Sequence, residues 1–222
     1  MRRNNSVINL TFFAICLALI LLMSFVPQLG YITIGVISFT LIHIPVLVFS
    51  YLKGWKWGWV YGLVFGLSSF LVAITRATGG LDIFFANYPI VAIVPRLLFG
   101  FLSGVVFSLI KKMIPDRSKR KLVLAPTCFI LTVIHSLLVF LFLYLFAKDA
   151  AEAAFGGAFW PSFYSMIFLV GTLPEAGVAF ITVPLICWPL EPFYERIFKN
   201  AKEAKKESRR LTLLLEKGLK ED

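Results

Sequence analysis

Four ionisable side chains lie within long apolar stretches of this chain, and a fifth polar residue lies at the edge of one. The four are His43, Arg96, His135 and Glu175, and the fifth is Asn87. Charged groups are costly inside a bilayer, so each is a candidate for ligand binding. Arg96 is the strongest candidate, because a guanidinium keeps its proton and its planar fork suits a carboxylate. It requires either Glu175 as a counter-ion or an anionic ligand, and we favour the ligand.

Glu175 and Asn87 also have structural interpretations. Glu175 follows Thr172 by three residues, which is the spacing of a capping box at a helix start. Asn87 stands two residues before Pro89, which predicts an N-cap for the helix that follows. Capping is the preferred role for Asn87, whereas capping and ligand contact are both open for Glu175.

The depth of these residues predicts where they meet. His43 and Arg96 are each expected about 7–8 Å below the outer surface, and Glu175 in the first turn of its helix. His135 is expected deeper, near the middle of its helix. These polar groups predict a small cavity open to the outside. The alternative is that His43 bridges helices and that His135, beside Ser136, is a hydrogen-bonded packing residue.

The elements that position these residues are predicted to be membrane-spanning helices. Hydrophobic residues make up 59% of the 222 residues, charged residues 15%, and the mean hydropathy is +0.85. A soluble domain has about 45–50% apolar and about 25% charged residues, so an ordinary soluble enzyme is excluded. Backbone in hydrocarbon must pair within its own segment, which predicts an all-α integral membrane bundle. Six segments are predicted to cross: about 7–26, 38–52, 55–74, 90–114, 122–146 and 172–193.

Basic residues orient this bundle. Nineteen of the 22 Lys and Arg residues lie in the termini or in the connections after the second and fourth segments. The positive-inside rule places both termini and these connections in the cytoplasm. Topology thus accounts for nearly all of the net charge of +10, and no nucleic-acid binding is indicated. We predict a six-helix substrate-binding domain over 1–195 and a basic, helical tail over 196–222, which contacts anionic lipid or a partner or is simply solvated.

Aromatic residues gather near the predicted outer face. Trp160 and Tyr164 are expected in the interfacial belt or over a pocket. Tyr31 lies in the first connection, residues 27–37, which is either an ordinary turn or a loop that closes over a solute. All three are therefore secondary candidates for substrate binding.

Small residues at helical spacing predict close helix packing. Ala14 and Ala18 lie four residues apart in the first segment and are the candidate docking residues for a partner helix. Two further stripes occur in the third and fourth segments. They consist of Gly58, Gly62, Gly66, Gly100 and Gly104. Because one bundle does not need so many, they indicate docking to another membrane protein.

Catalytic and cofactor motifs are missing. The sequence has no P-loop, no H-E-x-x-H zinc motif and no nucleophile elbow. Its three cysteines lie in separate apolar segments, and two histidines without a carboxylate cluster make a poor metal site. We therefore predict no enzyme activity, no metal and no cofactor in this chain. It also has no internal repeat, which disfavours an inverted-repeat carrier.

Several runs resemble the substrate-binding S components of energy-coupling factor (ECF) vitamin transporters over about residues 7–195. The most specific are a Gly-x-Ile-Ser run followed by His-Ile-Pro, and a Pro-Arg-x-Leu-x-Gly run. The matching stretches are 34–38, 41–46, 62–69, 85–89 and 95–100. The resemblance implies a multi-pass protein of the bacterial plasma membrane that binds a vitamin near its outer face. It also implies docking through Ala14 and Ala18 onto a coupling membrane subunit, with two cytoplasmic ATPases consuming the ATP.

The pantothenate type is the most similar subfamily. In that case Arg96 would hold the carboxylate, and Asn87, His43 or Glu175 would serve the hydroxyls and the amide, with aromatic rings over the methyl groups. S components for folate, riboflavin or a thiamine precursor share the fold and stay open. A self-sufficient ion-coupled carrier, a membrane scaffold and an intramembrane enzyme are the competing functions.

Overall fold

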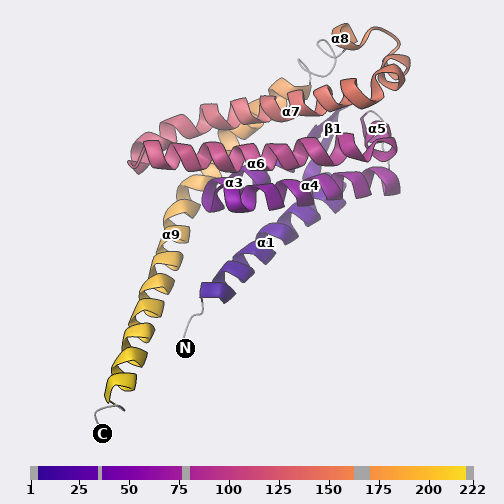
Figure 1. Cartoon of the computed structure of the whole chain (residues 1–222). Coiled ribbons are helices and arrows are strands. Elements are labelled where there is room, and N and C mark those ends of the chain that lie inside the picture. Colours follow the sequence, from indigo (N-terminus) through magenta and orange to yellow (C-terminus); the bar gives the residue numbers. More distant parts are fainter. Residues whose placement is uncertain (1–4, 35–36, 77–80, 163–170, 219–222) are drawn as a thin grey trace.

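The structure is a computed structural model that describes all residues except 1–4, 35–36, 77–80, 163–170 and 219–222 (Figure 1). Its long helices are α1 (Asn5–Phe25), α4 (Trp55–Arg76), α6 (Pro89–Met113), α7 (Arg117–Phe155) and α9 (Leu173–Gly218). The shorter elements are α2 (Pro27–Gly30), β1 (Tyr31–Ile34), β2 (Ile37–Thr40), α3 (His43–Lys53), α5 (Asp82–Asn87) and α8 (Phe159–Ser162). Within the described residues, five helices are long and apolar enough to cross a membrane. The chain is therefore a multi-pass membrane protein.

The second predicted crossing is not a single helix. Residues 37–40 form strand β2, which pairs antiparallel with β1, and α3 begins only at His43. Ile and Thr residues before and after the turn favour extended backbone. The first connection, expected as a turn or a loop, is therefore largely a hairpin, with Tyr31 opposite Thr40 and Ile34 opposite Ile37.

Helix α3 lies at the centre of the bundle. Its 11 residues span only about 16 Å, about half of the hydrocarbon thickness. Every residue from 42 to 52 is buried, and the helix contacts α1, α4, α6 and α9. A short helix preceded by a strand is tolerated at membrane depth when protein surrounds it. The prediction that 38–52 forms one helix is therefore wrong for 38–42, because strand β2 and the two residues after it precede α3.

The two glycine stripes pack against each other inside this molecule. Gly58 of α4 and Gly100 of α6 meet so closely that a Cβ on either would collide with the carbonyl oxygen of the other. A Cβ on Gly104 would lie 2.6 Å from the Cα of Trp55, which is also too close. Helices α4 and α6 run side by side in Figure 1. The glycine stripes thus pack α4 against α6 within the bundle, and the prediction that they dock another protein is wrong.

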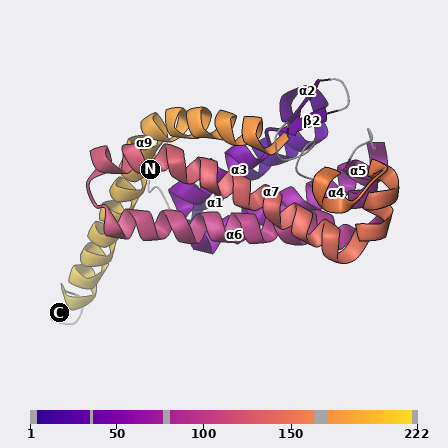
Figure 2. The same cartoon turned by 90° about the horizontal axis from the view of Figure 1, so that it is seen from above.

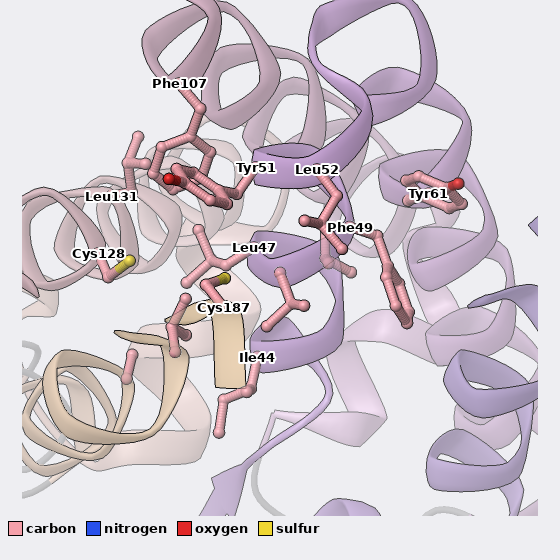
Figure 3. Close-up of a cluster of buried hydrophobic side chains, with 14 of the residues drawn as sticks. Ile44, Leu47, Phe49, Tyr51, Leu52, Tyr61, Phe107, Cys128, Leu131 and Cys187 are labelled. Carbon is pink, nitrogen blue, oxygen red and sulfur yellow. The ribbon is translucent and has the colours of Figure 1, made fainter. Parts of the chain in front are cut away.

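The buried side chains around α3 form the larger of two apolar clusters (Figure 3). Leu47 and Tyr51 point toward Phe107 of α6, Cys128 of α7 and Cys187 of α9. On the other side of α3, the ring of Phe49 lies 5.6 Å from that of Tyr61 in α4. These contacts set the position of α3, whose first residue His43 is one of the candidate site residues. The second cluster joins the end of α4 to α5, α6, α7 and α8.

The two ends of the bundle differ in charge. The basic residues after α3, at the end of α6 and at the start of α7 gather at the end where the chain termini also lie (Figure 1). Helices α5 and α8 and the hairpin lie at the opposite end in both views (Figures 1 and 2). Helix α9 is continuous from Leu173 to Gly218, so the predicted tail 196–218 extends the last crossing helix without a break.

Candidate functional site

Arg96 is held in the interior by the break in hydrogen bonding that Pro95 creates. Proline has no N–H, so Pro95 cannot donate to the carbonyl of Val91 four residues earlier. Arg96 Nη1 donates to that oxygen instead, at 2.9 Å. The guanidinium lies 4.1 Å from the centroid of the Phe85 ring, a cation–π contact. Arg96 is only 6% exposed, so its charge faces the protein rather than the lipid headgroups.

His135 of α7 lies beside this guanidinium. Its ring centroid is 4.6 Å from that of Phe99 and 5.7 Å from that of Phe65, and the same Phe65 ring lies 5.8 Å from Arg96. His135 and Arg96 also interact electrostatically. Neither ring nitrogen of His135 has a hydrogen-bond partner in the described part of the chain. Burying such a group is costly, so the described contacts do not provide the hydrogen bond that the packing interpretation requires.

Glu175 connects α9 to the hairpin. Its Oε1 accepts a hydrogen bond of 2.5 Å from the backbone N–H of Thr40, the last residue of β2. The carboxylate therefore serves a neighbouring element, which is a role that the capping-box interpretation did not include. Glu175 also interacts electrostatically with Arg96.

His43 follows Thr40 by three residues and begins α3. It is fully buried, and the backbone of Thr40 and of Glu175 lies close to its ring. It interacts electrostatically with His135. His43, Arg96, His135 and Glu175, hereafter the polar cluster, thus come from α3, α6, α7 and α9.

The chemistry of the polar cluster is that of binding. It combines a permanent cation, a carboxylate and two imidazoles inside an apolar enclosure. The cation attracts an anion, while the carboxylate and the imidazoles can exchange hydrogen bonds with hydroxyl or amide groups. Such a combination suits a small polar acid.

Other predicted site residues lie apart from the polar cluster. Asn87 is the last residue of α5 and is exposed, and the N-cap of α6 is Tyr88, without a side-chain cap bond. The N-cap prediction for Asn87 is therefore wrong, because α5 extends through it. Trp160 of α8 is 55% exposed and packs on Tyr144 at 5.3 Å.

Two of the predicted residues cannot be placed in the site. Tyr31 begins β1, and its side chain lies outside the description. Tyr164 lies outside the described residues altogether. For both, a role in substrate binding stays a prediction.

Helix α1 presents its small residues outward. It packs on the bundle through Cys16, Ile20 and Ser24, which recur every four residues and are buried. Ala14 and Ala18 lie on a different side of the helix and are exposed. The predicted docking pair is therefore accessible to another helix.

Sequence reasoning missed a buried ion-pair cluster at the basic end. Glu191 of α9 is 3% exposed; its Oε1 lies 2.8 Å from Arg120 Nη2 and its Oε2 lies 3.2 Å from Arg117 Nε. Glu191, Arg117 and Arg120 are hereafter the ion-pair cluster. Glu191 lies within the sixth apolar segment, so its carboxylate was a signal of the same kind as Glu175. Arg117 and Arg120 lie in a basic connection, where the positive-inside rule already accounts for their charge, so the sequence does not single them out.

A comparison with known families supports a binding role. A family model described as "ECF transporter, substrate-specific component" matches residues 9–187. A search of curated proteins found no match. The family match covers α1 to the middle of α9 and includes all four members of the polar cluster.

Proposed function

The chain belongs to the family of substrate-specific components of ECF transporters, and from this premise we propose that it binds pantothenate at the polar cluster. The observation that carries the proposal is the buried guanidinium of Arg96, anchored to Val91 within electrostatic range of the part-buried Glu175 and of the buried His135. Pantothenate offers one carboxylate, hydroxyls, an amide and a gem-dimethyl group. The carboxylate matches a cation, the hydroxyls and the amide match polar side chains, and the gem-dimethyl group matches aromatic rings.

Arg96 is the proposed partner of the vitamin carboxylate. A guanidinium has five N–H donors in a planar fork that suits a carboxylate, and the bond to Val91 holds the Arg96 guanidinium in the interior. His43 and Glu175 are the proposed partners of the hydroxyls and the amide. Phe65, Phe85 and Phe99 already surround the cation and histidine, which makes them suitable neighbours for the methyl groups.

The basic end is proposed to face the cytoplasm of a bacterial cell. The positive-inside rule supports this orientation, since the termini and most Lys and Arg residues lie at that end. The polar cluster is then reached from the opposite side, where the hairpin, α5 and α8 lie. Glu175 and Thr40 join the hairpin to the cluster, so a movement of the hairpin would open or close the access to it.

Delivery of the vitamin is proposed to need partners. The chain would dock through Ala14 and Ala18 onto the coupling membrane subunit, while two cytoplasmic ATPases supply the energy. The exposure of both alanines supports this docking, because small residues let helices approach closely.

Binding of labelled pantothenate to the purified protein tests the site. Arg96→Gln should weaken binding about 10- to 100-fold, which is the loss of one charge-assisted interaction. Lys148→Gln, which removes an exposed cation next to the kink of α7, is the matched control and should bind as the unchanged protein does. Equal affinity in Arg96→Gln would contradict the carboxylate assignment. Mass spectrometry of the co-purifying small molecule would reveal folate, riboflavin or a thiamine precursor instead.

Docking requires a separate test. Ala14→Leu with Ala18→Leu should leave pantothenate binding unchanged and abolish ATP-driven uptake into vesicles that contain the coupling subunit and ATPases. Ile15→Ala, at a neighbouring exposed position of α1, is the control and should preserve uptake. Uptake by this chain alone under an ion gradient would instead support a self-sufficient carrier.

A further inference from the structure

The C-terminal part of α9 leaves the bundle across the direction of the other helices. In Figures 1 and 2 the helix bends and then runs at a steep angle to α4, α6 and α7. Pro184, Pro189 and Pro192 lie within α9, and each removes a backbone hydrogen bond and favours a bend. If the bilayer normal follows α4, α6 and α7, the segment after the prolines runs along the membrane surface. Residues 199–218 are hereafter the tail helix.

Aromatic packing holds α9 at the point where it leaves the bundle. The Phe12 ring of α1 lies 5.1 Å from Tyr194 and 6.4 Å from Phe198. Lys53, at the end of α3, lies 4.7 Å from the Phe198 centroid and donates to Asn9 at 2.7 Å. Helix α9 is thus tied to α1 and α3 at the basic end, directly before the tail helix begins.

The sequence of the tail helix is amphipathic at helical spacing. At about 100° per residue, its seven basic residues fall within an arc of about 140°. They are Lys199, Lys202, Lys205, Lys206, Arg209, Arg210 and Lys217. Small and apolar residues recur three or four apart on the other side. They are Ala201, Ala204, Ser208, Leu211 and Leu215, whereas Leu213 falls within the basic arc and Leu214 beside it. A basic side opposite an apolar side is typical of helices that lie in a membrane interface.

We infer that the tail helix lies on the anionic inner surface of the membrane and binds acidic lipid headgroups. Its direction places it along the surface, its apolar side can enter the headgroup boundary, and its basic side complements the negative charge of the leaflet. Three acidic residues accompany the seven basic ones, so the helix keeps a clear positive excess. The inference rests on the proposed orientation of the basic end, and it does not depend on the identity of the vitamin.

Fluorescent labels at two positions of the tail helix test this contact. The natural cysteines Cys16, Cys128 and Cys187 are buried, so a label directed at Ser208→Cys or Leu213→Cys reports on the tail. Position 208 lies on the apolar side and position 213 within the basic arc. The labelled full-length chain is placed in vesicles of phosphatidylcholine alone, or in vesicles with about a third phosphatidylglycerol, which mimic an anionic leaflet. Quenching by acrylamide, which is uncharged, measures exposure to water.

The expected result is that phosphatidylglycerol protects the label at 208 several-fold from acrylamide and the label at 213 much less. High salt should remove the protection, since headgroup attraction is screened. Replacing Lys202, Lys206 and Arg209 together by Gln should also remove it, whereas Glu203→Gln with Glu207→Gln should preserve or strengthen it. Equal quenching at 208 in both kinds of vesicle would overturn the inference. Protection that requires added ATPase subunits would overturn it too, in favour of a protein partner.

Discussion

The polar cluster and the ion-pair cluster each contain a buried arginine and a glutamate, but these side chains have different partners in the two clusters. In the ion-pair cluster, both oxygens of Glu191 are engaged by arginines, and Arg120 also donates to the carbonyls of Ile114 and Pro115. In the polar cluster, Arg96 donates to the backbone of its own helix and Glu175 accepts from the backbone of β2. A charged side chain that is anchored to the backbone keeps its position whether or not a charged ligand is bound.

The two clusters therefore differ in the partners of their charged groups. The ion-pair cluster joins the start of α7 to α9 at the basic end, and both of its arginines contact the Glu191 carboxylate. The polar cluster lies where the hairpin meets four helices, and the imidazole of His135 has no hydrogen-bond partner among the described residues. Buried polar groups of that kind are rare in a purely structural site.

Removing the shared carboxylate of the ion-pair cluster should have the largest effect on stability. Glu191→Ala leaves two arginines without their counter-ion, one of them well buried, so the free energy of unfolding should fall by about 3–5 kcal/mol. Thermal unfolding of the purified protein in detergent measures the change. Glu195→Ala, at an exposed position one turn later, is the control. A change below that of the control would show that the ion-pair cluster does not hold the bundle.

Changing the carboxylate of the polar cluster should cost much less. Glu175→Gln keeps an oxygen for the Thr40 N–H but loses the charge, so stability should fall by about 1 kcal/mol. Because a carboxylate near Arg96 competes with an anionic ligand, pantothenate affinity should rise a few-fold. Binding and thermal unfolding of the same preparation measure both effects. A tenfold loss of affinity would mean that the ligand needs the charge of Glu175.

The smallest effect is expected for the more exposed partner of Glu191. The Arg117 side chain is 32% exposed and lies 3.2 Å from the carboxylate, so Arg117→Gln should lower stability by only about 0.5 kcal/mol. Arg120→Gln, which removes the buried partner, should lower it several times more. Equal losses in the two variants would show that burial does not set the strength of this ion-pair cluster.

Much of the candidate site could be predicted from single residues. His43, Arg96, His135 and Glu175 were chosen because they interrupt apolar segments, and the structure brings all four together. Asn87, at the edge of an apolar segment, is predicted to be an N-cap from its spacing to Pro89, but it lies exposed at the end of α5. Local spacing does not say where one helix ends and the next begins, since short helices depend on tertiary packing.

The bonds within the site were harder to predict. Arg96 follows Pro95 in the sequence, but its hydrogen bond to the carbonyl of Val91 depends on the rotamer that turns the guanidinium back along the helix. Likewise, the contact between Glu175 and Thr40 joins residues far apart in the chain. Such pairings follow from the packing of α3, α6 and α9 around one another.

Sequence alone is enough to show that this is a membrane protein. It also shows which connections are basic and which polar residues interrupt the apolar segments. These properties follow from hydropathy and charge, which act residue by residue. Only the tertiary structure decided that residues 38–52 are part strand and part buried helix, and that the glycines of α4 and α6 meet each other. It also decided which arginine pairs with which glutamate, because each of these outcomes requires a neighbour that local sequence cannot specify.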